Sequence, residues 1–406
     1  MTAAGSVASR GPVRSLAALP AWRWWVVGSF LARLPTTMVV IALVLSGRRL
    51  GSYGLGAGLA ALYTVAAGVT ALWRGRVLDR GELRRGIVGE LIATAAAFAG
   101  TALLVRFRAP VSLVIVSVVA AGVASSAVIA GYRSFLPDVV GRDLVRPAYA
   151  VDAVLLEVGF VTGPALAGLL ALALGPVGVL WMMAGFALAA AVVSNARLPE
   201  RHPVAEAGIP APPPWSDPYV VANYLVTFAV GMMVGLLEAG FAPLAVVLGA
   251  EDGIGGICSA AYALGSGVGG ALFATRQAGR SSDGRLALVL VVVLALLVLP
   301  VAVAGSIPVL LGLLVLGGLP FATANAAASS HLQARLHPAR ATEGFALVTA
   351  SVLLGVGAGS GIASAVLAAE GSPRLLYAIA AVPTVAAAAA VAAWSIARTR
   401  HRPAVP

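Results

Sequence analysis

A short charged stretch, GRVLDRGELRR at residues 75–85, separates two long apolar segments, residues 52–73 and 86–105. Each apolar segment has about 20 residues, which is the length that an α-helix needs to cross the hydrocarbon core of a bilayer. Charged side chains are costly inside that core, so the stretch itself must lie outside it. The pattern predicts two membrane-spanning helices joined by a charged loop.

The composition extends this prediction to the whole chain. Of its 406 residues, 60% are hydrophobic and 11% are charged, whereas a soluble domain has about 25% charged residues. So few charges cannot cover a water-facing surface, and a chain this apolar does not stay disordered. All 27 basic residues are arginine, and the net charge is +11. We attribute that charge to arginine-rich loops beside a lipid bilayer, not to nucleic-acid binding.

Twelve apolar windows are long enough to span a membrane, and the chain lacks the ten-residue alternation of a β-barrel. The expected fold is an all-α integral membrane protein with twelve transmembrane helices. The windows are residues 22–46, 52–73, 86–105, 109–132, 147–172, 174–195, 218–248, 254–275, 285–304, 307–330, 342–368 and 374–397.

The arginines also predict the orientation, because cytoplasmic loops are enriched in basic residues. With the N-terminus inside, 21 arginines lie in cytoplasmic segments, five lie outside and Arg33 lies within a helix. The five outside are Arg48, Arg49, Arg106, Arg108 and Arg374. We expect both termini to be cytoplasmic. The lysine-free, alanine-rich composition favours the inner (plasma) membrane of a bacterium.

The longest interruption between apolar windows is rich in proline and cannot be helical throughout. It divides the spans six and six. The expected organisation is a cytoplasmic tail at 1–21, a six-helix bundle at 22–195, a cytoplasmic linker at 196–217, a second six-helix bundle at 218–397 and a cytoplasmic tail at 398–406.

The two halves also resemble one another. An offset of 200 residues places Arg76 on Arg276 and Arg80 on Arg280, and an offset of 198 places residues 154–159 on 352–357. Internal repeats of this kind are common in membrane transporters. The offsets predict two pseudo-symmetric bundles.

The charged loop resembles a motif of the major facilitator superfamily, in which a glycine, a short apolar pair, Asp-Arg and a second glycine precede basic residues. The matching residues are Gly75, Asp79, Arg80, Gly81, Arg84 and Arg85. The chain departs from the motif by inserting Glu82 and Leu83 before the arginine pair. The resemblance implies that this loop is part of a cytoplasmic gate between the halves. Asp79 would then face arginines or the helix end near Thr342.

A second motif lies in the fifth apolar window and is similar to one found in the superfamily's drug/proton antiporters. Its residues here are Gly159, Gly163, Pro164 and Gly168. Ala167 replaces one glycine of the motif, and Val118 stands where the fourth helix of these antiporters often has an arginine. Glycines four residues apart also allow close helix packing. The motif is therefore equally compatible with antiport and with packing alone.

Four ionisable residues within the spans are candidates for substrate binding or proton coupling, because charges inside a membrane are costly and usually functional. They are Arg33, Glu157, Glu238 and Asp152. Arg33 and Glu157 each lie about eleven residues past a cytoplasmic boundary, roughly 16 Å deep, and we expect them to pair. Asp152 and Glu90 lie nearer the cytoplasmic face, where a side chain can reach water.

These features favour a secondary active transporter that works by alternating access. We expect it to export a hydrophobic or amphipathic small molecule coupled to an ion gradient, with the proton as the coupling ion, because the spans hold few polar residues for binding a sugar. An importer of a small metabolite and a non-transporting receptor or assembly partner are the alternatives. A membrane enzyme would need a catalytic cluster or a soluble domain, so we expect no enzyme activity. The single cysteine, Cys258, excludes an intramolecular disulfide framework and a cysteine-built metal site. We expect no metal, no cofactor and a monomer.

Overall fold

The computed structural model describes residues 12–80, 82–141, 144–200, 212–276, 284–337 and 341–400, and every regular element in these ranges is a helix. The helices are α1 (Pro12–Ala18), α2 (Pro20–Leu50), α3 (Tyr53–Arg80), α4 (Leu83–Arg106), α5 (Val111–Ser125), α6 (Val128–Ser134), α7 (Leu136–Val140), α8 (Val145–Arg197), η2 (Pro214–Ser216), α9 (Pro218–Val247), α10 (Ile254–Arg276), α11 (Gly284–Val298), η3 (Leu299–Val303), α12 (Ile307–Gln333), α13 (Ala341–Ala368) and α14 (Pro373–Arg400).

The lengths of these helices and their apolar outer surface identify a multi-pass membrane protein. Ten helical segments of the described chain are long and apolar enough to cross a bilayer. Large apolar side chains are exposed on their outer faces; Val69, Val116 and Val289 are each more than half exposed. A water-soluble protein would bury such side chains. In a bilayer, by contrast, lipid tails surround them at no cost.

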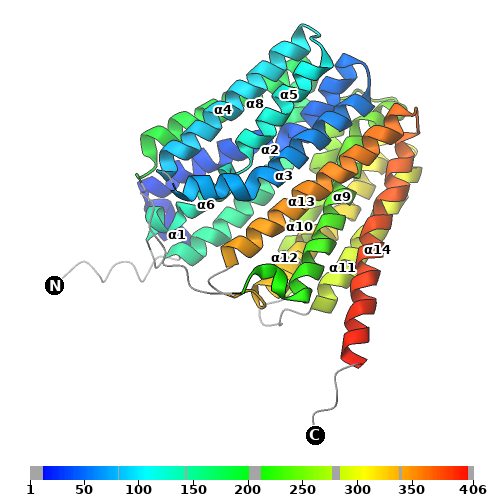
Figure 1. Ribbon diagram of the computed structural model, residues 1–406. Helices are drawn as coiled ribbons and strands as arrows, with labels where there is room; N and C mark the ends of the chain where they lie inside the picture. The colour runs from blue at the N-terminus through cyan, green and yellow to red at the C-terminus, as the bar shows by residue number, and fades with distance from the viewer. Residues whose placement is uncertain are drawn as a thin grey trace, which may run out of the picture.

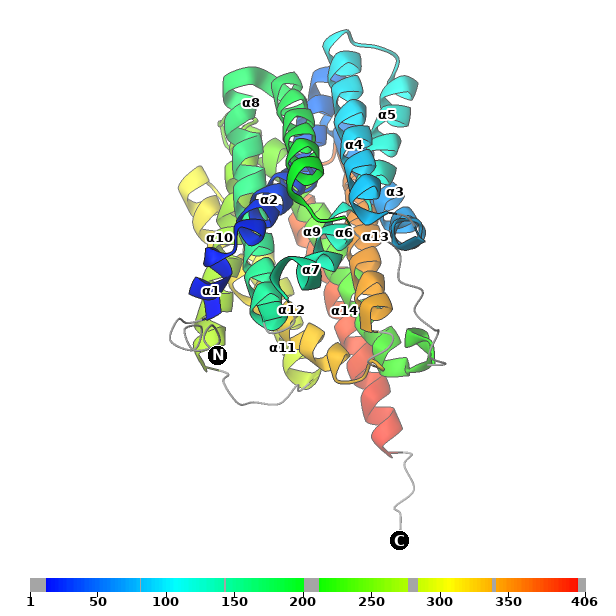
Figure 2. The ribbon, with the colours of Figure 1, turned by 90° about the vertical axis from the view of Figure 1, so that its left-hand side faces the viewer.

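Helix α8 reverses its direction at Gly175. It is 53 residues long, about twice the length of a single crossing. At Gly175 the backbone has φ 69° and ψ 174°, a conformation that glycine adopts readily because it has no Cβ. The two arms of α8 run side by side in opposite directions (Figure 2). Counting α8 as two crossings and adding α10 gives the expected twelve, a number that stays a prediction.

The helices form two bundles with the same internal packing (Figure 1). In the first bundle α2 packs on α3 and α8, and α5 packs on α3 and α4. In the second bundle α9 packs on α10, α13 and α14, and α12 packs on α10 and α11. The contacts repeat in the same order along the two halves, as the internal sequence repeat predicts. The architecture is a pair of pseudo-symmetric helical bundles.

The two bundles meet along two helix pairs, α3 with α13 and α8 with α10. Helix α1 and the end of α14 lie at one end of the molecule, which we call the terminal end (Figures 1 and 2). The α4–α5 turn and the α8 reversal lie at the opposite, distal end (Figure 2). Gly54 of α3 approaches Ala368 of α13 so closely that a Cβ on the glycine would lie 2.8 Å from the Ala368 nitrogen. Small residues thus bring the two bundles into backbone contact.

The orientation of the chain in the membrane can be tested with reporter fusions. We expect fusions at Arg80, Arg201 and Arg402 to report the cytoplasm, because these positions adjoin the arginine-rich segments. Fusions at Arg106 and Glu370 should report the opposite side. The phosphatase activity and the fluorescence of paired reporter fusions show on which side of the membrane each position lies. An external signal at Arg201 would contradict the six-plus-six arrangement.

Candidate functional site

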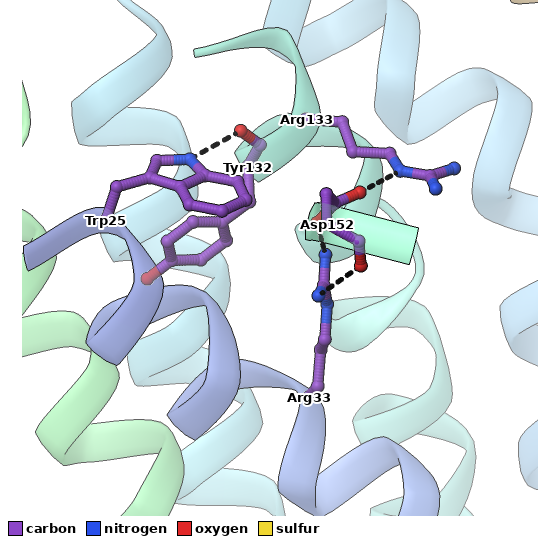
Figure 3. Close-up of polar contacts among 5 residues, drawn as sticks. All are labelled: Trp25, Arg33, Tyr132, Arg133 and Asp152. Carbon is purple, nitrogen blue, oxygen red and sulfur yellow. Dashed lines mark hydrogen bonds and ion pairs between the residues drawn. The ribbon is translucent and has the colours of Figure 1, made fainter. Parts of the chain in front are cut away.

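A buried ion cluster joins three helices of the first bundle. Arg33 of α2 contacts a carboxylate oxygen of Asp152 of α8 through Nη2, and its Nη1 donates a hydrogen bond to the Asp152 backbone oxygen at 3.4 Å. From α6, the Nε of Arg133 donates to the second carboxylate oxygen at 2.6 Å. Asp152 therefore lies between two guanidinium groups (Figure 3).

The packing of α2 against α8 brings Arg33 and Asp152 together. Thr37 lies one turn beyond Arg33 on α2, and Gly163 lies three turns beyond Asp152 on α8. A Cβ on Gly163 would lie 2.0 Å from the Oγ1 of Thr37, so only glycine allows this approach. Because residues three or four apart share a helix face, the same face of α2 presents both Arg33 and Thr37 to α8.

Two aromatic residues fix α6 beside α2, which positions Arg133. The indole nitrogen of Trp25 donates to the backbone oxygen of Tyr132 at 2.9 Å (Figure 3). The hydroxyl of Tyr132 contacts the hydroxyl of Ser194 on α8. Trp25 and Tyr132 are both fully buried, so their polar atoms must find partners within the protein. The sequence alone did not indicate these contacts, because they join segments more than 60 residues apart.

The cluster holds two positive charges and one negative charge. The side chains of Arg33 and Asp152 are at most 1% exposed, whereas that of Arg133 is 42% exposed. The Nε of Arg33 is buried and has no hydrogen-bond partner among the described residues. Inside a membrane such a cluster is stable only while the carboxylate stays between the guanidinium groups.

The structure pairs Arg33 with Asp152. The sequence predicts Glu157 as the partner of Arg33; the Glu157 side chain lies outside the described residues, so that pairing stays a prediction. Asp152 and Glu90 also do not reach water: both are buried. Glu90 of α4 accepts a hydrogen bond from the Nε of Arg74 of α3 at 3.0 Å. Helix packing supplies cations to both carboxylates, which explains why neither has to reach the membrane surface.

Glu238 is the charged candidate of the second bundle, and its surroundings are different. It is half-buried on α9, nine residues from the distal end of that helix. No described residue forms an ion pair or a hydrogen bond with its carboxylate. The hydroxyl of Tyr262 of α10 is buried and likewise has no hydrogen-bond partner in the described chain. The ring of Tyr262 meets that of Phe321 of α12 edge to face, with centroids 5.9 Å apart.

Two hydrogen bonds join the bundles at the distal end. The Tyr53 hydroxyl donates to Oδ1 of Asp252 at 2.7 Å, and the Ser364 hydroxyl donates to the backbone oxygen of Gly54 at 2.7 Å. The guanidinium of Arg48 lies 5.5 Å from the centre of the Tyr53 ring. Among the described residues, no group of acidic, histidine or cysteine side chains could hold a metal ion.

A comparison with protein families identifies this architecture. The family model of the Major Facilitator Superfamily matches residues 25–250, more than half of the chain. The chain belongs to the major facilitator superfamily. No curated protein matches the sequence. Membrane transport is therefore the function that its fold supports.

Solved structures of major facilitator transporters have a similar fold. A bacterial homologue of the human lysosomal transporter Spinster, in an inward-facing and unoccupied conformation, has a TM-score of 0.70 at 15% identity. The alignment covers 97% of this chain and 99% of that one. The POT family transporter PepTSo has a TM-score of 0.70 at 12% identity, with coverage of 97% and 99%. The human organic anion transporter MFSD10 (TETRAN) has a TM-score of 0.62 at 17% identity, with coverage of 93% and 99%.

The loop that resembles the superfamily motif is described in part. Glu82, which departs from the motif, caps α4: its carboxylate accepts hydrogen bonds from the backbone nitrogens of Arg84 and Arg85, each at 3.0 Å. The side chain of Arg84 contacts Glu200, three residues past the end of α8. A capping carboxylate at this position satisfies two amides that the helix leaves free. The inserted residues thus begin the next helix.

The remaining parts of the expected gate lie mostly outside the described residues. These are Gly81 and the side chains of Asp79, Arg80 and Thr342. Gly75 is described and has open space around it. The gate assignment of Asp79 therefore stays a prediction.

The antiporter-like motif of α8 packs against two neighbours. Gly163 contacts Thr37 of α2, and Gly168 faces α10, where a Cβ would lie 2.4 Å from the Gly253 backbone oxygen. Gly256 of α10 approaches the backbone of Pro164 equally closely. The motif thus connects α2 within the first bundle to α10 in the second.

Neutralising Asp152 tests whether the ion cluster holds the first bundle together. We expect Asp152→Asn to lower the stability by about 3–5 kcal/mol, because two guanidinium groups would remain without a counter-charge. Unfolding of the purified protein in detergent, followed by tryptophan fluorescence, measures this loss. Glu157→Gln is the matched control and should have little effect. A larger loss for Glu157→Gln than for Asp152→Asn would show that Arg33 depends on Glu157 instead.

Proposed function

We propose that this chain is a secondary active transporter that exports a hydrophobic or amphipathic small molecule in exchange for protons. The observation that carries the proposal is the contrast between the two bundles. The described buried carboxylates of the first bundle, Asp152 and Glu90, each have an arginine partner, whereas Glu238 of the second bundle has no described cation. The two bundles meet at the distal end, so rocking about this contact would expose the space between them to each side in turn.

Alternating access requires the distal contacts to be broken in one half of the cycle. The hydrogen bond between Tyr53 and Asp252 and that between Ser364 and Gly54 each cross from one bundle to the other. Each is a single neutral or charge-assisted hydrogen bond, worth about 0.5–3 kcal/mol net. Contacts of that strength can hold one conformation and still open on the timescale of transport.

Glu238 is the carboxylate best suited to carry the coupling proton. A charged carboxylate without a cation is costly in a membrane interior, so this side chain gains from binding a proton or a cationic group. Asp152 already has two guanidinium partners and has less need of a proton. Arg33 and Asp152 would then serve mainly to shape the first bundle around the substrate.

An amphipathic substrate fits the polar groups that the interior offers. Within the second bundle these include Glu238 and the hydroxyls of Tyr262, Ser266 and Ser360, and the three hydroxyls are buried without hydrogen-bond partners in the described chain. The ring of Phe321 packs against that of Tyr262. The similar human protein MFSD10 is an organic anion transporter, which agrees with a substrate of mixed polarity.

The proposed setting is the inner (plasma) membrane of a bacterium, with a monomeric chain and both termini in the cytoplasm. The terminal end then faces the cytoplasm and the distal end faces outward. The distal contacts would close the outer side in this conformation. Transport would need no cofactor and no enzyme activity.

A disulfide across the distal contact tests alternating access. A Cβ on Gly58 would lie 3.8 Å from the Cβ of Ser364, the separation typical of a disulfide. We make Gly58→Cys/Ser364→Cys in a Cys258→Ala background. We expect its transport flux to fall by more than about tenfold when the cysteine pair is oxidised, and to return when the disulfide is reduced. Flux is measured in proteoliposomes. A cysteine pair within one bundle, Gly100→Cys/Ser117→Cys, is the control and should stay active. Undiminished flux in the oxidised Gly58–Ser364 pair would contradict the rocking mechanism.

Replacing Glu238 separates coupling from binding. We expect Glu238→Gln to abolish uptake driven by a pH gradient into inverted proteoliposomes, because glutamine cannot release a proton. Exchange of labelled for unlabelled substrate at equal pH should continue, since that reaction needs no proton. The substrate is first found by screening a panel of amphipathic compounds. If flux driven by the pH gradient persists in Glu238→Gln, another carboxylate carries the coupling proton, and Asp152 and Glu157 are the candidates.

A further inference from the structure

A groove at the distal end of the first bundle carries two arginines beside an apolar wall. Its volume is about 500 Å³. Arg49 lines it from the last turn of α2, and Arg106 from the last turn of α4. The rest of the lining comes from the reversal of α8, including Leu174, Gly175 and Trp181.

The charge of this groove is uncompensated. None of the residues that line it is acidic. Both arginines are exposed, and neither forms an ion pair with a described residue. Their chain neighbours behave differently: Arg48 lies over the ring of Tyr53, and Arg108 does not line the groove.

The position of each arginine in the last turn of a helix accounts for each residue separately. It does not explain why the two side chains line the same groove. A cation in the last turn of a helix interacts favourably with the free carbonyl groups there. That effect would be the same if the two side chains pointed apart. Here the two side chains line one hollow from different helices. Such convergence favours a shared anion.

The apolar wall of the groove indicates that the ligand has an apolar part beside its anionic group. Leu174 is 58% exposed and Trp181 is 45% exposed, and both belong to the part of α8 that turns at Gly175. The turn lies where the spanning helices end, which is the depth of the lipid headgroups. Tryptophan is enriched at that depth. A molecule that satisfies the arginines and this wall has an anionic head and an apolar tail.

We propose that the groove binds an anionic phospholipid of the surrounding membrane. Its phosphate would accept hydrogen bonds from Arg49 and Arg106, and an acyl chain would lie along Leu174 and Trp181. Guanidinium groups suit phosphate oxygens because they donate several hydrogen bonds in a fixed plane. The site is separate from the proposed transport site and depends neither on the substrate nor on proton coupling.

Native mass spectrometry of the purified protein can test the proposal. The protein is titrated with phosphatidylglycerol, and bound lipids are counted at each concentration. We expect Arg49→Gln/Arg106→Gln to weaken binding of the first lipid by about tenfold or more. Arg48→Gln/Arg108→Gln removes the same charge from neighbouring positions and should bind as the unchanged protein does. Thermal unfolding of both variants checks that they are folded.

Three results would overturn the proposal. Equal loss in the two double variants would show that general surface charge attracts the lipid. Equally tight binding of phosphatidylcholine, which has no net charge, would show that the arginines do not select an anion. Displacement of phosphatidylglycerol by glycerol phosphate at similar concentrations would show a site for a soluble anion.

Discussion

The ion cluster around Asp152 is the interaction on which the first bundle depends. Arginine cannot lie inside a bilayer without a counter-charge, and Arg33 lies within a run of buried residues of α2, residues 32–35. Asp152 supplies the charge from α8, and Arg133 adds a second cation from α6. The helices must therefore stay in one register, and the glycine that faces Thr37 allows the approach. The ion cluster determines where α2, α6 and α8 contact one another. The small residues, such as the glycine that faces Thr37, determine how closely α2 and α8 approach.

The sequence predicted the fold class and the helical segments well, because both follow from local composition. Partners were harder to predict. Asp152 lies seven residues before Gly159, on the face of α8 whose glycines pack against Thr37 of α2. The sequence did not show which helix packs against the glycines of α8. Depth along the helix was the only guide to the partner of Arg33, and it favoured Glu157. Likewise Glu82 stood out as an insertion, yet its role as a helix cap depends on where α4 begins.

The two bundles share their packing but not their chemistry. An offset of 198 residues places Asp152 on Ala350 and Glu238 on Val40, so neither carboxylate has a charged counterpart. The repeated contacts need only small residues at matching positions, and these are present in both halves. The duplicated scaffold thus leaves each half free to hold a different ionisable group, one paired and one open. Such asymmetry suits a transporter in which the two halves have different tasks.

The contact between α8 and α10 is made by backbone against backbone at Gly168 and Gly256. Surfaces of this kind have no interlocking side chains, so they can separate and rejoin without rotamer changes. A methyl group added at either glycine would act as a wedge that pushes the bundles apart while leaving each bundle's own core untouched. Natural variation at these two positions would then appear as an altered balance between conformations, in a protein that is still folded and still inserted.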